Sequence, residues 1–369
     1  MSNYNINDIT IVNIIEAVKQ RPTTYGIDIE NPHGLIYEIF ANSLDEHLAG
    51  HGNLIKIILQ KDGGITIEDF GRGIPPEVNT NFNKTGIDIC FTSMHGGSKI
   101  VDGNTSYKQS LGTNSIGATL VNITSDLLHV FVKRYGKIFK ETFKSGYKIG
   151  EQELIGTYDE KVESTGTKVT FYPTAKVFVT LELDMHKLHH LLDSTCYMNP
   201  ALTIKLYDER HDKIKETVFN HANGLEDYIK NKLETKSSVI HNIVIDKELP
   251  IIKLEDESGK TYYKHNLASV KTIITFTDGN NEDLVLYANS GYMPEGGSPL
   301  TILRSSLVKS INEIGRKNKI LKDKEPDFDS ALIRNGLLGI LSVKVNMPRF
   351  KGNEKRALIN SDINGDLGG

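Results

Sequence analysis

Residues 33–49 most constrain the fold, because they form an amphipathic segment whose polar face has a specific chemistry. Glu38, Asn42 and Asp45 are spaced i, i+4 and i+7, which places them within about 60° of one another on a helix. The opposite side is predicted to bury against a core through Ile36, Ile39, Phe40 and Leu44. An Asn oxygen can bind a metal, and a Glu can take a proton from water. Taken alone, the segment is better explained by an ordinary amphipathic helix with a solvated polar face.

Composition indicates an ordinary globular chain. The 369 residues are enough for two domains, each with its own core, and 38% are hydrophobic and 24% charged. A net charge of -4 argues against a protein that coats nucleic acid over its whole surface, although a local basic patch is compatible with it. The two cysteines, Cys90 and Cys196, predict neither a disulfide framework nor a zinc site. No signal peptide or membrane-spanning run is evident, so we expect a cytoplasmic protein without membrane contact.

The order of elements predicts two α+β domains, 1–220 and 221–369. In the first, helices are expected over 8–20, 33–49 and 182–194, and strands over 55–59, 65–68, 127–134, 137–143, 167–172 and 202–207. The charged stretch 208–224 is interpreted as the connection between the domains. In the second, strands are expected near 238–245, 271–276, 283–289 and 338–346. A long helix over 298–321 carries Arg304, Lys309, Arg316, Lys317 and Lys319, and Lys322 follows it.

Three further motifs lie between and after these elements. Asp69-Phe70-Gly71-Arg72-Gly73-Ile74-Pro75 follows a strand, where an Asp can accept a hydrogen bond from an exocyclic amine and glycines let a flat base approach the backbone. The glycines of 106–117 precede a helix, where backbone N–H groups and the helix dipole favour a phosphate. Ser164-Thr165-Gly166-Thr167 leads into the strand over 167–172, and its hydroxyls could bind the base or a water beside it. Each motif alone is also compatible with an ordinary turn.

Their order along the chain resembles the ATPases with the Bergerat nucleotide-binding fold. Within that group the sequence is most similar to the ATPase subunits of type IIA topoisomerases, meaning gyrase B and its topoisomerase IV counterpart. The supporting residues are Arg21-Pro22, Asn42 to Gly50, Gly71 to Pro75, His95 to Lys99, Ser106-Tyr107-Lys108 and the loop Phe350 to Lys355. The resemblance implies a mixed sheet covered by helices on one side, followed by a smaller transducer domain with a βαβ crossover.

The resemblance also implies roles for individual residues. Glu38 is expected to be the general base and Asn42 the magnesium ligand, while Asp69 with Thr167 would hold the adenine amine. Glu46 and Arg72 correspond to a salt-bridged pair beside the adenine, and Arg134 to an arginine at the pocket mouth where aminocoumarins bind in relatives. Lys355 would reach the γ-phosphate. The implied nucleotide-binding set is Asn42, Glu46, Asp69, Arg72, Gly73, Ile74, Pro75, Lys99, Tyr107, Gly112, Thr113, Asn114, Ser115, Ile116, Gly117, Thr167 and Asn353.

Some positions depart from the family pattern. Leu111 and Ser115 replace lid glycines, and Asn114 replaces a phosphate-contacting His. Asn353 replaces a Gln that is one methylene longer. A positive φ at the two former glycines would cost about 1 kcal/mol or more. These changes concern lid closure and the hydrolysis rate more than nucleotide binding.

The implied function is Mg²⁺-dependent binding and slow hydrolysis of ATP that gates homodimerisation, in service of DNA strand passage by a type IIA topoisomerase. Tyr4 and Ile9 would belong to an arm that reaches the partner subunit. Only fourteen residues follow Lys355, so DNA cleavage is expected to need a subunit or domain that this chain lacks. The alternative is a stand-alone, nucleotide-dependent dimerisation module with little hydrolysis. The sequence does not distinguish supercoiling from decatenation.

Overall fold

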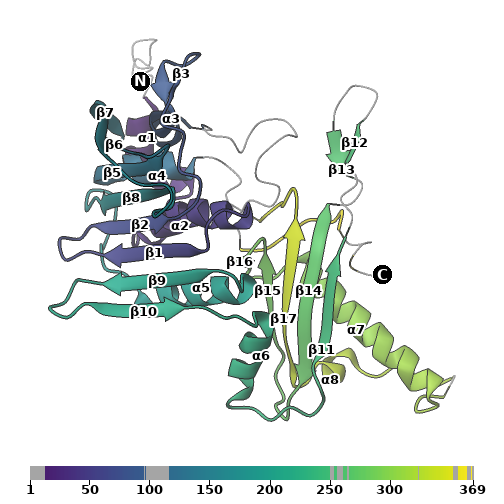
Figure 1. Cartoon of the computed structure of the whole chain (residues 1–369). Coiled ribbons are helices and arrows are strands. Elements are labelled where there is room, and N and C mark those ends of the chain that lie inside the picture. Colours follow the sequence, from purple (N-terminus) through teal and green to yellow (C-terminus); the bar gives the residue numbers. More distant parts are fainter. Residues whose placement is uncertain are drawn as a thin grey trace, which may run out of the picture. The chain divides into compact units, whose positions relative to one another are not determined.

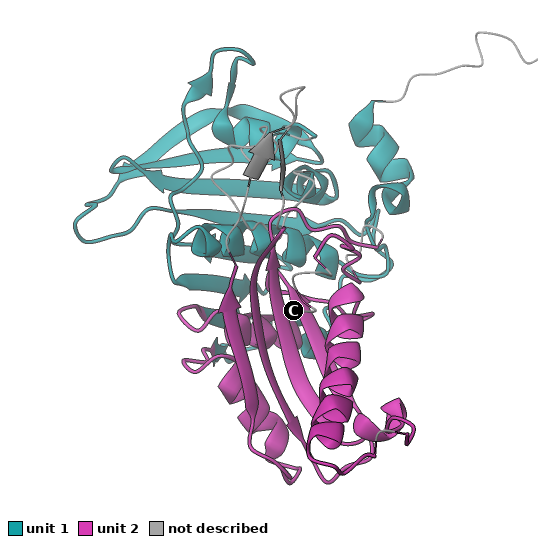
Figure 2. Ribbon diagram, turned by 90° about the vertical axis from the view of Figure 1, so that its right-hand side faces the viewer, with its two compact units in different colours: residues 1–106, 114–188, 204–218 teal, residues 107–113, 189–203, 219–369 magenta. Residues whose placement is uncertain are grey.

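The computed structural model describes residues 13–94, 96, 116–249, 253–255, 261–263, 266–322, 324–351, 356–363 and 367. The described chain forms two compact units (Figures 1 and 2). Unit 1 comprises the described residues within 1–106, 114–188 and 204–218, and unit 2 those within 189–203 and 219–369. The domain assignment 1–220 and 221–369 remains a proposal.

Unit 1 is built on an eight-stranded sheet with the order β10-β9-β1-β2-β8-β5-β6-β7. The ladders β1–β2, β2–β8, β8–β5, β5–β6 and β6–β7 are antiparallel. Asp62, Gly63 and Gly64 form the predicted turn between β1 and β2, with Gly63 at a φ of 87°. The strands are β1 Leu54–Leu59, β2 Ile65–Asp69, β5 Ser125–Arg134, β6 Lys137–Lys144, β7 Tyr147–Thr157, β8 Gly166–Pro173, β9 Thr203–Asp208 and β10 Lys215–Phe219, and a separate pair is β3 Val78–Asn79 with β4 Lys84–Thr85.

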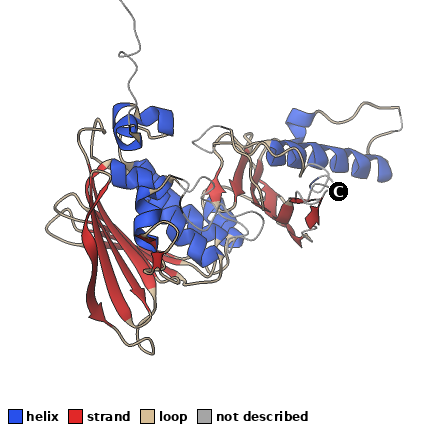
Figure 3. Ribbon diagram, turned by 90° about the horizontal axis from the view of Figure 1, so that it is seen from above, coloured by secondary structure: helices blue, strands red, loops and turns tan. Residues whose placement is uncertain are grey.

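Helices lie on one face of this sheet (Figure 3). The central one is α2 (His33–Leu48), which buries the predicted residues Ile36, Ile39, Phe40 and Leu44 to at most 2% exposure. Strand residues at alternate positions are buried as well, for example Ile55 and Ile57 on β1. The remaining helices are α1 Ile14–Gln20, the 3₁₀ helix η2 Pro22–Tyr25, α3 Gly86–Thr92, α4 Gly117–Ile123 and α5 Met185–Met198, whose residues from His189 onward belong to unit 2.

Unit 2 is a five-stranded sheet with the order β11-β14-β17-β15-β16. β15 and β17 pair in parallel and α7 connects them, which is the predicted βαβ crossover. Leu341 and Val343 face a core shared with Leu300 of α7, whereas Leu338 and Ile340 face a core shared with α6 on the opposite side. The elements are α6 Leu225–Leu233, β11 Ile243–Glu248, β14 Leu267–Phe276, β15 Asp283–Ala288, β16 Gly291–Tyr292, α7 Ser298–Lys317, α8 Ser330–Ile333 and β17 Leu337–Val345, with a separate pair β12 Lys253–Glu255 and β13 Thr261–Tyr263.

The α+β fold class is confirmed, but several elements were not predicted from the sequence. β10 lies inside the stretch interpreted as a connection, and β7 and α6 were not predicted. β10 and β7 are the two edge strands, and most of their side chains are exposed, so neither shows the apolar alternation of a buried strand. β3, β4 and α3 lie between the motif at 69–75 and the glycines of 106–117, where no element was predicted.

Candidate functional site

Asp69, the last residue of β2, is the best-defined group of the candidate site. Its side chain is 7% exposed and lies against α2 and the start of β8. Oδ1 accepts hydrogen bonds from the backbone N–H groups of Gly71 (3.0 Å) and Thr167 (3.3 Å), and Oδ2 accepts one from the Ser43 hydroxyl (3.2 Å). Among the described residues, Oδ1 therefore has two donors and Oδ2 has one. Since a carboxylate oxygen can accept two hydrogen bonds, Oδ2 can accept a further donor.

Burial raises the pKa of the Asp69 carboxyl to about 7. The two backbone donors and the Ser43 hydroxyl act in the opposite direction, and the nearby Glu46 carboxylate adds to the increase. A buried acid with a pKa near neutrality is uncommon for a residue that only stabilises the fold. Such shifts are concentrated at functional sites, which supports Asp69 as a ligand-binding group.

Glu46 and Arg72 form a two-point ion pair beside Asp69. Arg72 Nε lies 3.0 Å from Glu46 Oε2 and its terminal nitrogen 2.9 Å from Oε1, while the Arg72 backbone N–H also donates to Oε2 at 2.9 Å. The structure thus places together the two residues that the family pattern pairs. A planar, bidentate arrangement of this kind holds the segment after β2 against α2.

The glycines after β2 are needed for a reason that the sequence analysis did not give. A Cβ on Gly71 would lie 2.7 Å from Cβ of Glu46, and a Cβ on Gly73 would lie 2.9 Å from the carbonyl oxygen of Lys133. Gly73 also has a φ of 73°. Packing of Gly71 against Glu46, and of Gly73 against β5 with a left-handed backbone, therefore requires these glycines in addition to the expected approach of a flat base. The next residue, Ile74, donates its N–H to Thr167 Oγ1 at 3.3 Å.

Of the three polar residues that the sequence spacing placed on one face of α2, only two reach the surface. Asn42 is exposed and Glu38 is partly exposed, but Asp45 is buried, at 1% exposure. The Glu38 carboxyl lies against the start of α4, because a Cβ on Gly117 would be 1.9 Å from Glu38 Oε2. The structure thus brings Glu38 to the glycine that ends the lid segment, whereas Asp45 belongs to the interior.

Arg134, at the end of β5, contacts the backbone of the segment that follows β2. Its guanidinium donates to the Gly73 carbonyl (2.6 Å) and to the Arg72 carbonyl (3.3 Å), and packs 4.9 Å from the ring centre of Tyr135. Its Nε is buried and has no hydrogen-bond partner within the described part of the chain. A bound water or ligand would satisfy such a donor.

Several predicted site residues lie outside the described residues, and so do Tyr4 and Ile9 of the expected N-terminal arm. The site residues are Lys99, Tyr107, Gly112, Thr113, Asn114, Ser115, Asn353 and Lys355. Ile116 precedes α4 and Gly117 opens it, and Pro75 is exposed. Thr165, one of the hydroxyl residues expected to bind the base or a water, donates to the Gly71 carbonyl. Ser43, for which no role was predicted, donates to Asp69, and its hydroxyl beside Asn42 was the only available signal.

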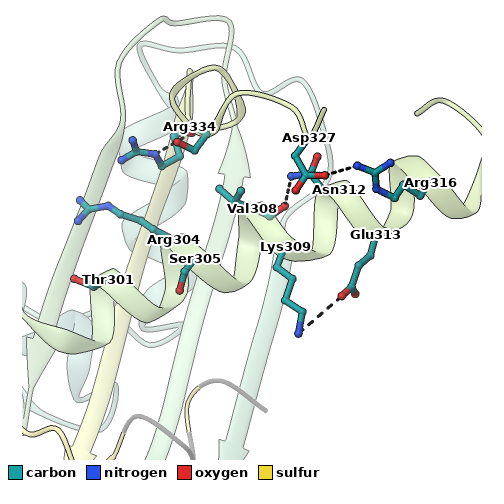
Figure 4. A pocket seen from close by; sticks show the side chains of 11 residues that line it. Thr301, Arg304, Ser305, Val308, Lys309, Asn312, Glu313, Arg316, Asp327 and Arg334 are labelled. Carbon is teal, nitrogen blue, oxygen red and sulfur yellow. Dashed lines mark hydrogen bonds and ion pairs between the residues drawn. The ribbon is translucent and has the colours of Figure 1, made fainter. Parts of the chain in front are cut away.

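In unit 2, a separate groove of about 660 Å³ lies between the basic helix α7 and the segment that leads to α8 (Figure 4). Arg304 and Arg334 both pair with Glu282, at 2.6 and 3.0 Å. Arg316 pairs with Asp327 at 2.6 Å and donates to two backbone carbonyls of the following loop. Two arginines of α7 are thus engaged in structural contacts, whereas Lys309, Lys317 and Lys319 are exposed.

Comparison with known proteins gives consistent matches. Residues 224–366 match the family model described as DNA gyrase B. The DNA gyrase subunits B of Clostridium acetobutylicum and Archaeoglobus fulgidus are 33% and 34% identical over 98% of this chain. The chain spans about half the length of these curated relatives, 54% in each case.

Solved structures agree over nearly the whole chain. The 43K ATPase domain of Thermus thermophilus gyrase B, solved in complex with an aminocoumarin, superposes with a TM-score of 0.75 at 27% identity, covering 96% of this chain and 86% of that one. The ATP-binding domain of Francisella tularensis topoisomerase IV gives a TM-score of 0.72 at 27% identity, with coverages of 96% and 88%. In the part of the chain that the structure describes, no helix is long and apolar enough to cross a membrane.

Proposed function

Because the chain belongs to the family of type IIA topoisomerase ATPase subunits, we propose that it binds and hydrolyses ATP in the site around Asp69 and Glu38. The observation that carries this proposal is the buried Asp69 carboxyl, whose Oδ2 can accept one further hydrogen bond. The exocyclic amine of adenine is such a donor. The known relatives are longer than this chain, so strand passage, DNA and partner subunits are equally part of the proposal.

Glu38 is the proposed general base. Its carboxylate is partly exposed beside the start of α4, where it can accept a proton from a water molecule. It does not need to contact the base, so its removal is expected to affect hydrolysis more than binding.

Asn42 is the proposed protein ligand of Mg²⁺, one turn further along the exposed face of α2. Mg²⁺ commonly keeps several waters and takes only one or two protein oxygens together with substrate phosphates. Among the described residues no group of three His, Cys, Asp or Glu could hold a metal alone, which agrees with a site of this open kind. When bound, the ion would neutralise charge on the phosphates.

The remaining nucleotide contacts are proposed from the family pattern. The residues 99–117 that precede α4 would close on the triphosphate, and Asn353 and Lys355 would report the γ-phosphate to the transducer domain. A contact made with ATP but not with ADP provides the differential interaction that a two-state switch needs. We therefore propose that ATP binding drives homodimerisation, and that a DNA-cleaving subunit or domain completes the topoisomerase.

DNA is the proposed substrate of the assembly, and the exposed lysines of α7 are the candidate contacts on this chain. Lys309 pairs only loosely with Glu313, at 3.9 Å on the surface, so its ammonium remains available to a phosphate. Lys317 is the last residue of the same helix, and Lys319 follows its C-cap Asn318.

Steady-state phosphate release from the purified chain tests the proposal directly. The expected result is slow, Mg²⁺-dependent hydrolysis of ATP that double-stranded DNA stimulates. The alternative, a nucleotide-dependent dimerisation module, predicts tight ATP binding with negligible turnover. Absence of ATP binding by calorimetry would contradict both.

A further inference from the structure

Ser43 and Asp69 form a buried side-chain contact between α2 and the end of β2. Ser43 is only 4% exposed, and its hydroxyl lies 3.2 Å from Asp69 Oδ2. The other two donors to Asp69 are backbone N–H groups, which no side-chain substitution removes. Among the described residues, Ser43 is therefore the only side chain that donates a hydrogen bond to this carboxylate.

We propose that Ser43 is a positioning residue that keeps Asp69 an acceptor-only group and thereby makes the site select adenine over guanine. The inference rests on the proposed function and extends it to base specificity. Adenine presents an amine where guanine presents a carbonyl oxygen. An ionised carboxylate accepts from the amine and repels the carbonyl, whereas a protonated carboxyl can donate to the carbonyl. Selectivity thus depends on which form of Asp69 the site stabilises.

The charge balance around Asp69 makes the Ser43 hydroxyl important. Burial favours the protonated form, and so does the Glu46 carboxylate on α2. Arg72 pairs with Glu46 and so offsets its negative charge, whereas the guanidinium of Arg134 on β5 donates to the Gly73 carbonyl. The residues that contact Asp69 from the start of β8 carry no charge. Removal of the Ser43 donor therefore shifts Asp69 towards the protonated form. It also removes one of the three hydrogen bonds that orient the Asp69 carboxylate.

The test compares the wild-type chain with Ser43→Ala, Ser43→Thr and the control Thr66→Val. Thr66 is a fully buried hydroxyl residue on the same strand as Asp69, but it bonds Thr170 and Gln60 instead. Calorimetry at pH 6 and pH 8 gives the ratio of the GTP and ATP dissociation constants. Carbon NMR of the carboxyl groups gives the titration midpoint of Asp69 without nucleotide, with Asp69→Asn identifying its signal.

The expected result for Ser43→Ala is a selectivity ratio reduced about tenfold at pH 8, in line with the loss of one hydrogen bond to a charged group. The Asp69 midpoint is expected to move to higher pH. Ser43→Thr, which keeps the hydroxyl, should restore both values, and Thr66→Val should change neither. An unchanged ratio and midpoint in folded Ser43→Ala would overturn the positioning role while leaving ATP binding intact. If the wild-type chain does not bind ATP, the proposed function fails and this inference fails with it.

Discussion

The carboxylate of Glu38 lies directly against Gly117, the first residue of α4. A β-carbon at position 117 would be 1.9 Å from Oε2 and 2.6 Å from Cδ of Glu38, which is far inside van der Waals contact. The sequence analysis assigned this glycine to a phosphate cradle, but the structure shows in addition that it makes space for the proposed general base. The position of the Glu38 carboxyl therefore depends on the absence of a side chain at Gly117.

Gly117→Ala is expected to displace the Glu38 carboxyl and to reduce ATP turnover by about 10²-fold or more, since positioned general bases contribute that much. ATP affinity should fall less than turnover, because Gly117 is one of the expected phosphate contacts, whereas Asp69 and its partners, the proposed adenine site, are unchanged. Gly34→Ala is the matched control on α2, where a Cβ meets no atom within 4 Å. Equal turnover in the two variants would show that the contact has no role in hydrolysis.

Glu38→Ala should bind ATP normally and lose hydrolysis by about 10²–10⁴-fold, because the carboxylate acts on water and not on the nucleotide. Single-turnover phosphate release and calorimetry measure the two properties separately. Turnover within threefold of the wild type would remove Glu38 from the role.

Asp69→Asn should weaken ATP binding and stabilise the fold at the same time. The amide oxygen can still accept from the N–H groups of Gly71 and Thr167, and the new NH₂ can donate to the Ser43 hydroxyl. Above pH 7 the substitution removes the desolvation of a buried carboxylate, but it also removes the acceptor for adenine. We expect a loss of about 1–3 kcal/mol in ATP binding together with a higher Tm. A lower Tm would indicate that Asp69 stabilises the fold instead.

Most elements with strong apolar periodicity were predictable from the sequence. The buried face of α2, the β1–β2 hairpin and the strands β5, β6 and β8 were all expected within a few residues of their observed bounds. α6 was missed although Leu225, Tyr228 and Ile229 have helical spacing and are buried. Its nine residues provide only about two and a half turns of pattern, and the contact with the sheet of unit 2 is what makes that pattern decisive.

The site shows a different limit of the sequence. Spacing on α2 correctly grouped Glu38 with Asn42, yet it could not show that Asp45 turns into the interior at 1% exposure. Arg316 is one of the basic residues predicted on the helix over 298–321, yet its guanidinium binds the loop after α7. Both outcomes depend on neighbours that are distant along the chain or on a loop conformation, and neither is encoded in residue type and spacing.

ATP affinity is expected to depend on pH near neutrality. Because the folded-state pKa of Asp69 is about 7, above its ordinary value, the carboxyl is increasingly protonated as pH falls below 7. A protonated carboxyl is a poorer acceptor for adenine, so the ATP dissociation constant should rise by up to about tenfold per pH unit below the midpoint. The same raised pKa makes the contribution of Asp69 to stability greatest at acid pH, and that contribution declines as pH rises from about 4 to 7. Calorimetry in several buffers, with Asp69→Asn as the pH-insensitive control, measures the effect.

DNA binding by α7 is expected to depend on its exposed lysines and not on Arg316. Lys309→Gln and Lys317→Gln remove exposed charges at helical positions, and Lys319→Gly removes a third where the φ of 58° suits glycine better than lysine. The triple variant should therefore fold at least as well as the wild type. If each lysine contacts one phosphate, the slope of the logarithm of the binding constant against the logarithm of salt concentration should fall by about 0.9 per lysine. Fluorescence anisotropy with a short duplex over a salt series provides the slopes.

Arg316→Ala provides the contrasting variant for that experiment. Its guanidinium donates to the carbonyls of Lys322 and Glu325 and pairs with Asp327, so its loss should lower the Tm, at about 0.5–1.5 kcal/mol for each hydrogen bond. The salt slope of the folded variant should stay close to that of the wild type, because this cation is already engaged within the protein. A slope that changes with Arg316 but not with the three lysines would mean that DNA opens the Arg316 contacts. A slope that changes with neither would leave α7 as a solvated helix, and DNA would have to contact another part of the assembly.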